Sequence, residues 1–312
     1  MNRRLFVLAL TGALTTLGAC SHGEMTAVKP ESDPDASSRR MVWAAMGTVW
    51  TLDYLAPPEF PFSATAEVEE SVREVVYRYD MVFSDWAEDS ELRRIERRGL
   101  TRWQEPSGLF LEGLRYAKDA WDATGGAFDI TIGAVQWKAA RRSVGMDKVR
   151  IQGQRFRFVK DPRRLTFGGI AKGMAVGAVA MELLSRGVRD FRIDAGGGNL
   201  ALVGFADGKS DSWPEAQTYK LRDGKVWHVS RSSAKAHRDS PDDFDPNGKE
   251  VATQHIWDPK DVTRALHARD VVICGAAAKE SQQRAGAFAD VYSKAVLIRG
   301  TFRVPKECFV RR

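Results

Sequence analysis

The sequence predicts an α+β fold. Apolar residues recur at helical spacing in several segments, and in others they alternate with polar residues as in β-strands. Helical and strand segments follow one another along much of the chain. The segment from Lys148 to Val159, however, turns back on itself around Gly153 and is typical of a β-hairpin. Hairpins mixed with alternating helices and strands favour an α+β fold over a purely doubly wound parallel sheet.

The first nineteen residues predict a lipoprotein signal peptide. Arg3 and Arg4 give the start a positive charge, and a short apolar stretch from Leu5 to Leu10 follows. The segment Leu17 to Cys20 resembles the lipobox of bacterial lipoproteins, which implies cleavage before the cysteine and lipidation of Cys20. Ser21 in the next position fits sorting to the outer membrane. An ordinary secretory signal with a chance cysteine is the alternative.

Residues 20–40 are rich in Ser, Pro, Asp, Glu and Lys and lack apolar periodicity. We expect them to form a flexible linker between the lipid and a folded domain that spans residues 41–312. That domain would face the periplasm, anchored either to the outer membrane or to the outer face of the inner membrane. Its length suits one large domain or two closely packed lobes, and 43% hydrophobic residues suffice for a sizeable core.

The net charge does not indicate a nucleic-acid partner. The formal charge of the whole chain is +6, and it falls to about +4 when Arg3 and Arg4 leave with the signal peptide. Basic clusters at residues 93–98 and 138–142 carry no recognised nucleic-acid motif. They favour a solvated surface, or one facing anionic lipid head groups.

Two cysteines, Cys274 and Cys308, remain in the folded part once Cys20 is set aside. They allow at most one disulfide, and their spacing does not decide whether they meet. Cys274 lies in the apolar run Val271 to Cys274, where a buried, inert thiol is the default expectation. No CxxC or Cys/His cluster is present, so a structural zinc site is not predicted.

The elements before the hairpin are predicted from apolar spacing and capping residues. Ser90 or Asp89 is placed to cap a short helix, and Ser107 starts the next one. The other predicted elements in this half are a strand over Met41 to Leu55 interrupted at Gly47, a helix over Thr65 to Phe83, the end of the Ser107 helix at Gly125 and Gly126, and a short strand over Phe128 to Ile132.

The elements after the hairpin begin with a helix from Ile170 to Arg186, which Gly187 ends. Its apolar face is predicted to hold Ile170, Met174, Ala178, Met181 and Leu184. The later predictions are strands over Phe191 to Asp194, Leu200 to Phe205, Lys225 to Ser230 and Val271 to Ile273, an exposed insertion over Ser233 to Glu250, a strand ending at His255 to Pro259, a helix over Lys279 to Val291, and a strand or helix tail over Ala295 to Gly300.

Glycines frame the Ile170 helix on both sides. Gly168 and Gly169 precede it, and residues 196–198 form a glycine loop after the next strand. A helix N-terminus behind glycines offers free N–H groups and a favourable dipole to an anion. This arrangement suggests a phosphate-bearing ligand. The alternative is a turn–helix–strand unit in which glycine serves packing alone.

Several self-sufficient catalytic signatures are absent. The chain has no GxSxG, HExxH or GxxxxGK[ST] motif. In Gly168 to Gly173 the lysine precedes a glycine, and no Ser or Thr follows it. A serine hydrolase and a P-loop nucleotidase are therefore not supported.

A set of short motifs in fixed order carries more information than any of them alone. In chain order they are MGT at residues 46–48, FSDWAEDSEL at 83–92, GGAFDIT at 125–131, GGIAKG at 168–173, the glycine loop at 196–198, and HIWDP at 255–259. Together they resemble the ApbE family of FAD:protein FMN transferases over nearly the whole folded part. Residues 289–294, ADVYSK, occupy the place of the family's last motif.

The resemblance implies a two-lobed, T-fold-like α+β domain that binds FAD in a cleft between its lobes and needs Mg²⁺. It also implies a reaction that cleaves the FAD pyrophosphate, releases AMP and joins FMN to a threonine hydroxyl through a phosphoester. The partner would be a flavin-acceptor protein that carries the target threonine. Glycine loops and a cation are the groups that pyrophosphate cleavage requires.

The resemblance also assigns roles to individual residues. Lys172 and Asp290 are the candidate catalytic residues, with Lys172 beside the pyrophosphate. The candidates for cofactor binding are Met46, Trp86, Ala127, Phe128, Asp129, Thr166 and Ile256. The candidates for metal binding are the Gly169 carbonyl, the Asp290 carboxylate and Ser293. The alternatives are core aromatics for Trp86 and Phe128, a surface ion for Lys172 and a helix-surface carboxylate for Asp290.

Three departures from the family pattern bear on activity. Thr166 stands where the family commonly has Asp, Lys294 stands where it has a metal-binding Thr, and the stretch at Gln136 to Ala139 is shortened. A protonated lysine cannot bind Mg²⁺. Either the Lys294 ammonium pairs with Asp290 and replaces part of the metal's charge, or catalysis is lost and the chain binds FAD or a partner only.

Overall fold

The computed structural model describes residues 38–57, 60, 62–136, 142–204, 213–221, 224–233, 256–260, 263–264, 269–277 and 279–311. The predicted signal peptide, Cys20, most of the predicted linker, most of the predicted insertion and His255 lie outside these residues. Within them, no helix is both long enough and apolar enough to cross a membrane.

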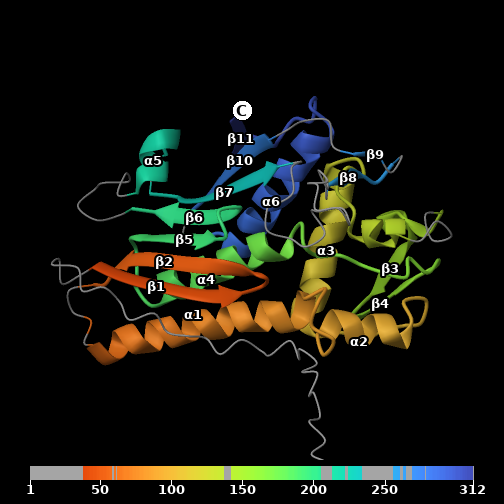
Figure 1. Cartoon of the computed structure of the whole chain (residues 1–312), viewed down its shortest axis with the longest axis horizontal. Helices are drawn as coiled ribbons and strands as arrows, with labels where there is room; N and C mark the ends of the chain where they lie inside the picture. Colours follow the sequence, from red (N-terminus) through yellow and green to blue (C-terminus); the bar gives the residue numbers. More distant parts are fainter. Residues whose placement is uncertain are drawn as a thin grey trace, which may run out of the picture.

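A seven-stranded sheet forms the larger part of the molecule (Figure 1). All its neighbouring strands are antiparallel. In spatial order the strands are β1 (Ser38–Ala45), β2 (Thr48–Leu55), β5 (Phe191–Ala195), β6 (Asn199–Val203), β7 (Val226–Ser233), β10 (Arg269–Ala276) and β11 (Cys308–Arg311).

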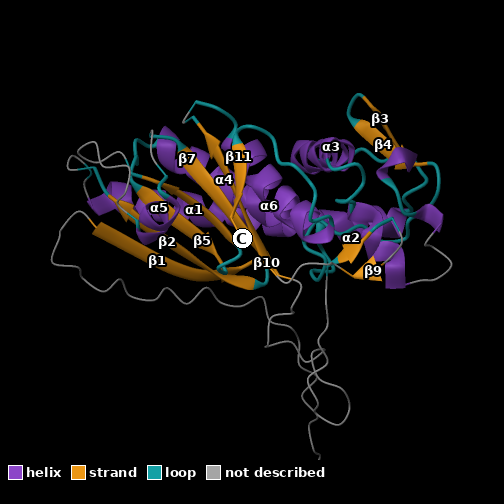
Figure 2. Ribbon diagram, turned by 90° about the horizontal axis from the view of Figure 1, so that it is seen from above, coloured by secondary structure: helices purple, strands orange, loops and turns teal. Residues whose placement is uncertain are grey.

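Three helices cover one face of this sheet, and a short helix lies on the other (Figure 2). The covering helices are α1 (Phe62–Phe83), α4 (Ala171–Ser185) and α6 (Gln282–Ile298). Residues along β6 alternate between the two faces. Ala201 and Val203 join the core beneath the helices, whereas Leu200 and Leu202 pack with α5 (Pro214–Tyr219). Burial on both faces explains why β6 is apolar throughout.

A smaller part lies beside the sheet (Figures 1 and 2). It contains α2 (Glu91–Arg98), α3 (Gly108–Ala123), the 3₁₀ helices η1 (Ile130–Gln136) and η3 (Met146–Lys148), and the hairpin of β3 (Val149–Gln152) and β4 (Arg155–Phe158). A two-stranded ribbon, β8 (Trp257–Asp258) with β9 (Thr263–Arg264), completes the described elements. This α+β arrangement in two parts is consistent with the expected two-lobed fold.

One continuous hydrophobic core joins the two parts. Phe83 at the end of α1 lies 4.8 Å, centroid to centroid, from Phe167, which precedes α4. Phe167 in turn lies 5.4 Å from Phe110 of α3, and Phe110 lies 5.6 Å from Phe156 of β4. Because these rings are all buried, they fix the smaller part against the helices of the sheet.

The helix starts follow the predicted capping residues. Ser90 Oγ accepts a hydrogen bond of 3.1 Å from the Arg93 amide, and Ser107 Oγ accepts one of 3.2 Å from the Phe110 amide. These bonds satisfy N–H groups that the first helical turn leaves free. The predicted helices at Thr65–Phe83 and after Ser107, the predicted hairpin and the predicted strands at Phe191, Leu200, Lys225 and Val271 are confirmed, with bounds shifted by a few residues.

The strand predicted at Phe128 to Ile132 is wrong. Asp129 Oδ1 accepts hydrogen bonds from both the amide and the hydroxyl of Thr131, at 2.8 and 2.6 Å. A carboxylate bonded to the backbone two residues ahead closes a turn, and a 3₁₀ helix follows from Ile130. The apolar alternation of the segment arises from its burial on a turn rather than in a sheet.

The predicted face of the Ile170 helix is also partly wrong, because Met181 is exposed. α4 is enclosed by α1, α6 and the sheet, so its small residues are buried as well as its large ones. Two further boundaries differ: the first strand begins at Ser38, inside the predicted linker, and residues 41–55 form a hairpin of two strands. Ala295 to Ile298 form the tail of α6, the second of the two predicted alternatives. α5 and β11 were not predicted.

Cys274 of β10 and Cys308 of β11 face each other across the strand pair and form a disulfide. The default expectation of a free, buried thiol at Cys274 is therefore wrong. The pairing depends on β11, a strand that the sequence analysis did not identify, and so the sequence left it open.

Candidate active site

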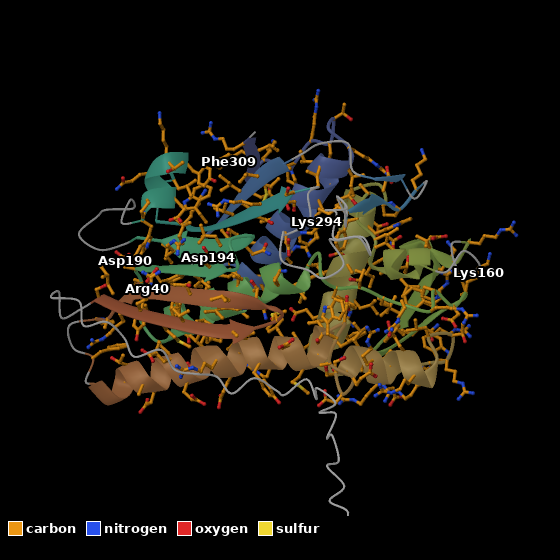
Figure 3. All side chains as sticks on the ribbon, in the orientation of Figure 1. Arg40, Lys160, Asp190, Asp194, Lys294 and Phe309 are labelled. Atoms are coloured by element: carbon orange, nitrogen blue, oxygen red, sulfur yellow. A yellow bond between two sulfur atoms is a disulfide. The ribbon has the colours of Figure 1, made fainter. Side chains whose placement is uncertain are left out.

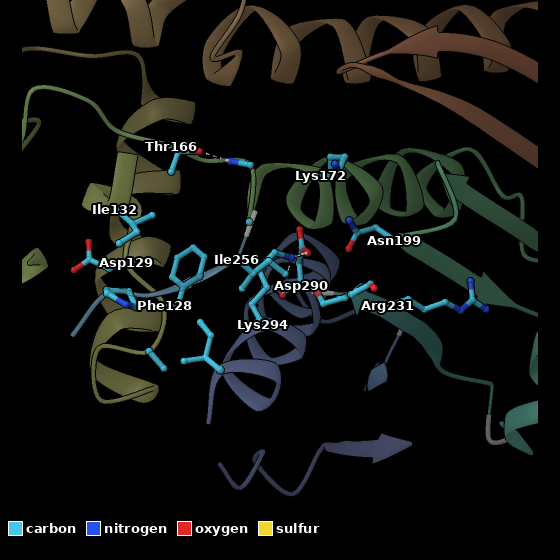
Figure 4. Close-up of a pocket in the computed structure, with 18 of the residues that line it drawn as sticks. Phe128, Asp129, Ile132, Thr166, Lys172, Asn199, Arg231, Ile256, Asp290 and Lys294 are labelled. Carbon is cyan, nitrogen blue, oxygen red and sulfur yellow. Dashed lines mark hydrogen bonds and ion pairs between the residues drawn. The ribbon is translucent and has the colours of Figure 1, made fainter. Parts of the chain in front are cut away.

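A pocket of about 690 Å³ opens where the N-terminus of α4, the middle of α6 and the smaller part meet (Figure 4). Glycine backbone, two lysines and apolar side chains make up most of its wall. The lining residues are Ala127, Phe128, Asp129, Ile132, Thr166, Gly168, Gly169, Lys172, Gly196, Gly197, Gly198, Asn199, Arg231, Ser232, Ser233, Ile256, Pro259, Asp290, Lys294 and Ile298.

The turn before α4 brings the backbone close to two side chains of the pocket. A Cβ atom on Gly169 would lie 2.9 Å from Phe128 Cε2 and 3.0 Å from Lys294 Cδ, so only glycine fits there. Thr166 fixes the start of the turn, since its amide donates to the Ile130 carbonyl at 2.8 Å. This contact ties the predicted phosphate-binding turn to the Phe128 segment of the smaller part.

The second glycine loop forms the opposite wall. Gly196 and Gly197 have φ angles of +68° and +70°, in the left-handed region that favours glycine. The Gly197 amide donates to Asp194 Oδ1 at 2.6 Å, and the Arg231 amide donates to the Gly198 carbonyl at 2.7 Å. The loop is thus held at both ends, by β5 and by β7, and it presents its backbone to the pocket.

Asp290 is fully buried in α6 at the base of the pocket. Its Oδ2 accepts from the Gly173 amide at 3.3 Å, and its Oδ1 accepts from Ser230 Oγ at 3.3 Å. The Lys294 ammonium contacts the same Oδ1 and also donates to the Asp290 carbonyl at 3.2 Å. Both carboxylate oxygens therefore have protein donors.

Lys172 is the second ammonium of the pocket, one residue into α4 (Figure 4). Burial lowers the pKa of Lys172; the Asp290 carboxylate opposes this shift and the Lys294 ammonium adds to it. Within the described part of the chain, no group accepts a hydrogen bond from Lys172 Nζ. Burial removes the water that would stabilise the ammonium charge. A bound anion would replace that stabilisation, so the Lys172 ammonium favours an anionic ligand.

Asp129 lines the pocket and also supports its wall. Burial raises the pKa of its carboxyl group, and its hydrogen bonds from Thr131 oppose that shift. Thr131 Oγ1 also accepts from the Gly145 amide at 2.7 Å, so the turn is fastened to the start of η3. The neighbouring Phe128 ring is thereby held over Gly169.

The structure brings together most of the predicted site residues but leaves three outside the pocket lining. Those it brings together are Ala127, Phe128, Asp129, Thr166, Gly169, Lys172, Ile256 and Asp290. Met46 lies in the β1–β2 turn, where its amide donates to Asp80 Oδ2 at 3.2 Å. Ser293 is buried behind Asp290, with its hydroxyl 2.6 Å from Ser232 Oγ and 3.0 Å from Ser230 Oγ.

Trp86 is the third residue outside the lining, and its side chain is 88% exposed. Its neighbour Asp85 links this loop to the pocket, because Asp85 Oδ2 accepts a hydrogen bond of 2.8 Å from Thr166 Oγ1. Trp86 is therefore free to stack on a ligand that extends beyond the pocket, but it does not form the pocket's wall. This exposure rules out the alternative that Trp86 is a core aromatic residue.

The sequence analysis missed Asn199, Arg231 and the serines after it. Asn199 directly follows the predicted glycine loop, and this adjacency was the available signal. Arg231 gave no local signal, because only the pairing of β6 with β7 brings it to Gly198. Its Nη1 donates to the Gly197 carbonyl at 3.3 Å, which places a third cation at the rim.

The side chains at Asp290 do not fit a divalent metal in this arrangement. Mg²⁺ requires several oxygen ligands in octahedral geometry. Lys294 contacts Asp290 Oδ1, and the Ser293 hydroxyl is bonded to Ser230 and Ser232. Among the described residues, no group of three or more His, Cys, Asp or Glu side chains is placed to hold a metal.

An antiparallel sheet backed by helices, with a cationic, glycine-rimmed pocket at their edge, defines the class of this α+β protein. The chain belongs to the ApbE family, whose family model matches residues 46–306.

Comparison with individual proteins agrees with this family. An FAD:protein FMN transferase from Vibrio cholerae serotype O1 is 24% identical over 207 residues, a match that spans 59% of this chain and 56% of the relative. The flavin transferase ApbE from Vibrio cholerae superimposes with a TM-score of 0.62 at 18% identity, covering 83% of this chain and 87% of that one. Pseudomonas stutzeri flavinyl transferase ApbE, in its apo form, gives 0.64 at 21%, covering 84% and 85%.

Proposed function

We propose that this chain is an FAD:protein FMN transferase. A threonine hydroxyl oxygen of an acceptor protein attacks the phosphorus of the FMN half of FAD. The bond from that phosphorus to the bridging oxygen breaks, AMP leaves with the bridging oxygen, and the hydroxyl proton passes to solvent. FMN remains on the acceptor through a phosphoester.

The observation that carries the proposal is the pair of ammonium groups, Lys172 and Lys294, between two glycine-built walls. Pyrophosphate cleavage concentrates negative charge on the phosphate oxygens and on the bridging oxygen. Fixed cations in a partly enclosed site stabilise that charge more strongly than water does. The family relatives named as flavin transferases support the same reaction.

The remaining wall suits the organic part of FAD. Phe128, Ile256 and Ile298 supply apolar surface on the side of the smaller part and α6. Phe128 is held over Gly169, so a ring system that contacts it would place its phosphates near the start of α4. Thr166 and Asn199 add polar groups on either side of the pocket.

The proposed partner is a flavin-acceptor protein with a target threonine, and the proposed place of action is the periplasm, with the chain anchored by a lipid on Cys20. The signal-like residues 1–19 and the Leu17 to Cys20 segment support the anchor. The Cys274–Cys308 disulfide fits an oxidising compartment. Radioactive palmitate supplied to growing cells tests the anchor, and a protein that carries no label would contradict it.

The transfer is tested with the full-length chain in mild detergent, FAD and a membrane extract of the source cells. We expect AMP release and a fluorescent flavin band that depends on the added protein. Lys172→Met should lower both by about 100-fold, as expected for loss of one group that stabilises transition-state charge. Lys118→Met is the matched control, since Lys118 lies on α3 outside the pocket and pairs with Asp122.

The alternative is a lipoprotein that binds FAD or a partner without transferring FMN. Bound, intact FAD with no AMP and no flavin band would favour that alternative and overturn the transferase proposal. Absorbance of the purified protein in the visible region separates an FAD-binding chain from one that binds no flavin.

A further inference from the structure

Lys294 occupies the place where the family resemblance puts a metal. It lies one helical turn after Asp290 on α6, so both side chains point the same way. Its ammonium contacts Oδ1 of Asp290, the carboxylate that the resemblance assigns to metal binding. Figure 3 shows Lys294 near the middle of the molecule, in contrast to Lys160 at the outer edge of the smaller part.

The methylene chain of Lys294 packs against Gly169, just as its ammonium contacts Asp290. Its Cδ and Cε atoms would lie 3.0 and 3.2 Å from a Cβ atom on Gly169, so the methylene chain runs across the glycine whose carbonyl is the other expected metal ligand. The lysine therefore lies against two of the three residues of the expected metal site, Gly169 and Asp290. A metal at Asp290 would have to displace the whole side chain.

The third expected ligand, Ser293, is buried and does not line the pocket. Its hydroxyl donates to the Asp290 carbonyl at 2.8 Å and meets two other serine hydroxyls, of Ser230 and Ser232. Asp290 Oδ2 is also used, by the Gly173 amide. These contacts are all buried, so the carboxylate is held by α4, α6 and β7 without help from a metal.

We propose that the Lys294 ammonium takes the role of the divalent cation and that this chain transfers FMN without a metal. The inference rests on the proposed function. An ammonium has three N–H donors, and two are directed to the Asp290 carboxylate and carbonyl. Among the described residues no third acceptor contacts the ammonium, and Lys294 lines the pocket, so the third donor can reach a phosphate oxygen.

In the transfer step, the Lys294 ammonium stabilises the negative charge that grows on the phosphate oxygens as the bridging P–O bond breaks. Lys172, on the neighbouring helix, supplies a second positive charge. Together the two ammonium groups match the charge of one divalent ion. They are carried by separate helices, so each can contact a different phosphate.

The test measures AMP release from FAD by the full-length protein in mild detergent, with the membrane extract as the source of the acceptor and with excess EDTA or with Mg²⁺. We expect the two rates of the wild type to agree within about twofold. Lys294→Thr should lose about 100-fold in EDTA, in line with loss of one charge-stabilising group, and recover with Mg²⁺. Lys294→Met keeps the stem without the charge, and Mg²⁺ should not rescue it.

Direct metal binding gives a second readout that does not depend on activity. Electron paramagnetic resonance with Mn²⁺ should show a bound ion in Lys294→Thr and none in the wild type at the same concentration. Lys118→Thr is the matched control and should behave as the wild type in both assays. Circular dichroism of each variant checks that it is folded.

Two results would overturn the inference: wild-type activity that EDTA abolishes and Mg²⁺ restores, or Mn²⁺ binding by the wild type as tight as that of Lys294→Thr. Failure of the proposed function looks different, with no AMP release by any variant in either condition. In that case the Mn²⁺ comparison still decides whether Lys294 excludes the metal.

Discussion

His228 is a buried histidine that the proposed reaction does not use. It lies in β7, 1% exposed, with its Nε2 atom 2.9 Å from Gln282 Oε1. The Gln282 amide nitrogen donates to the Ala277 and Glu280 carbonyls, so Oε1 is the acceptor and Nε2 carries the proton. Nδ1 has no hydrogen-bond partner among the described residues, so a second proton there would be buried without an acceptor.

This arrangement predicts acid sensitivity. Burial lowers the pKa of His228 from 6.5 to about 4, with the Gln282 hydrogen bond opposing the shift. A pKa that is lower in the folded chain means that the unfolded chain binds the proton first. The contribution of neutral His228 to the free energy of unfolding is therefore fully present above pH 6.5. As the pH falls from 6.5 to 4, the free energy of unfolding decreases by up to about 3 kcal/mol.

Urea unfolding between pH 7.5 and pH 4 measures this effect. His228→Gln removes the titrating group, so the difference in unfolding free energy between wild type and variant should shrink as the pH falls. Buried carboxyls such as Asp85 and Asp129 have raised pKa values and act in the opposite sense, but they are common to both proteins. A difference that stays constant with pH would contradict the prediction.

At the residue scale, the ordered motifs predicted the location of the pocket correctly, but they did not predict every residue that lines it. Phe128, Lys172 and Asp290 were predicted because each lies in a short segment that resembles an ApbE-family motif, and all three line the pocket. Arg231 was missed because it reaches the pocket through strand pairing, which has no local sequence signal. Met46 was placed in the pocket by motif alone, and it lies instead in the β1–β2 turn.

At the scale of elements, the contact between α4 and α6 positions the site. It depends on small residues that let the two backbones approach. A Cβ atom on Gly173 would lie 2.2 Å from the Gly286 carbonyl oxygen, and one on Gly177 would lie 2.1 Å from the Gln282 carbonyl oxygen. The close approach at Gly173 is what allows its amide to reach Asp290.

Gly177→Ala should therefore destabilise the fold. The added methyl group meets backbone, which cannot rotate away, and overpacking of this kind costs about 1–3 kcal/mol. Gly108→Ala is the matched control, because the same change in α3 meets nothing within 4 Å and should alter stability by less than about 0.5 kcal/mol. Chemical denaturation of both variants decides the matter, and equal midpoints would contradict the packing argument.

Helices and strands could be predicted from the sequence where their apolar residues follow a single helical or strand spacing. α1 and α3 have an apolar stripe on one side and a polar outer face, so the spacing of apolar residues located both helices. α4 is enclosed on several sides, and its apolar stripe did not identify the residues that pack most closely, the glycines. The turn at Asp129 was mistaken for a strand because a side-chain hydrogen bond, rather than a periodicity, determines it.

At the scale of the whole molecule, the sheet order could not be predicted. The α+β class followed from hairpins and alternating elements, but β5 pairs with β2 across more than a hundred residues, and β10 lies between β7 and β11. Pairings so distant along the chain depend on burial of the common core and not on local propensity. The pairing of β6 with β7 brings the glycine loop after β5 and Arg231 of β7 to one pocket.

A disulfide at the edge of this sheet makes the stability of the protein depend on oxidising conditions. β11 is a short edge strand, and the Cys274–Cys308 disulfide joins it to β10. The bond closes a loop with a sequence separation of 34, for which the loss of chain entropy in the unfolded state corresponds to about 4 kcal/mol. A chain that folds in an oxidising compartment can use this constraint, whereas a reduced chain cannot.

A chain with Cys20 changed to Ser should therefore resist alkylation until it is reduced, and then take two labels. Replacing both Cys274 and Cys308 by Ser should lower the urea midpoint by an amount corresponding to at most about 4 kcal/mol, and reductant should lower the midpoint of the parent but not of this variant. Because neither cysteine lines the pocket, AMP release under native conditions should persist. Labelling of the unreduced chain would show that the cysteines are free and would remove the link between this fold and an oxidising compartment.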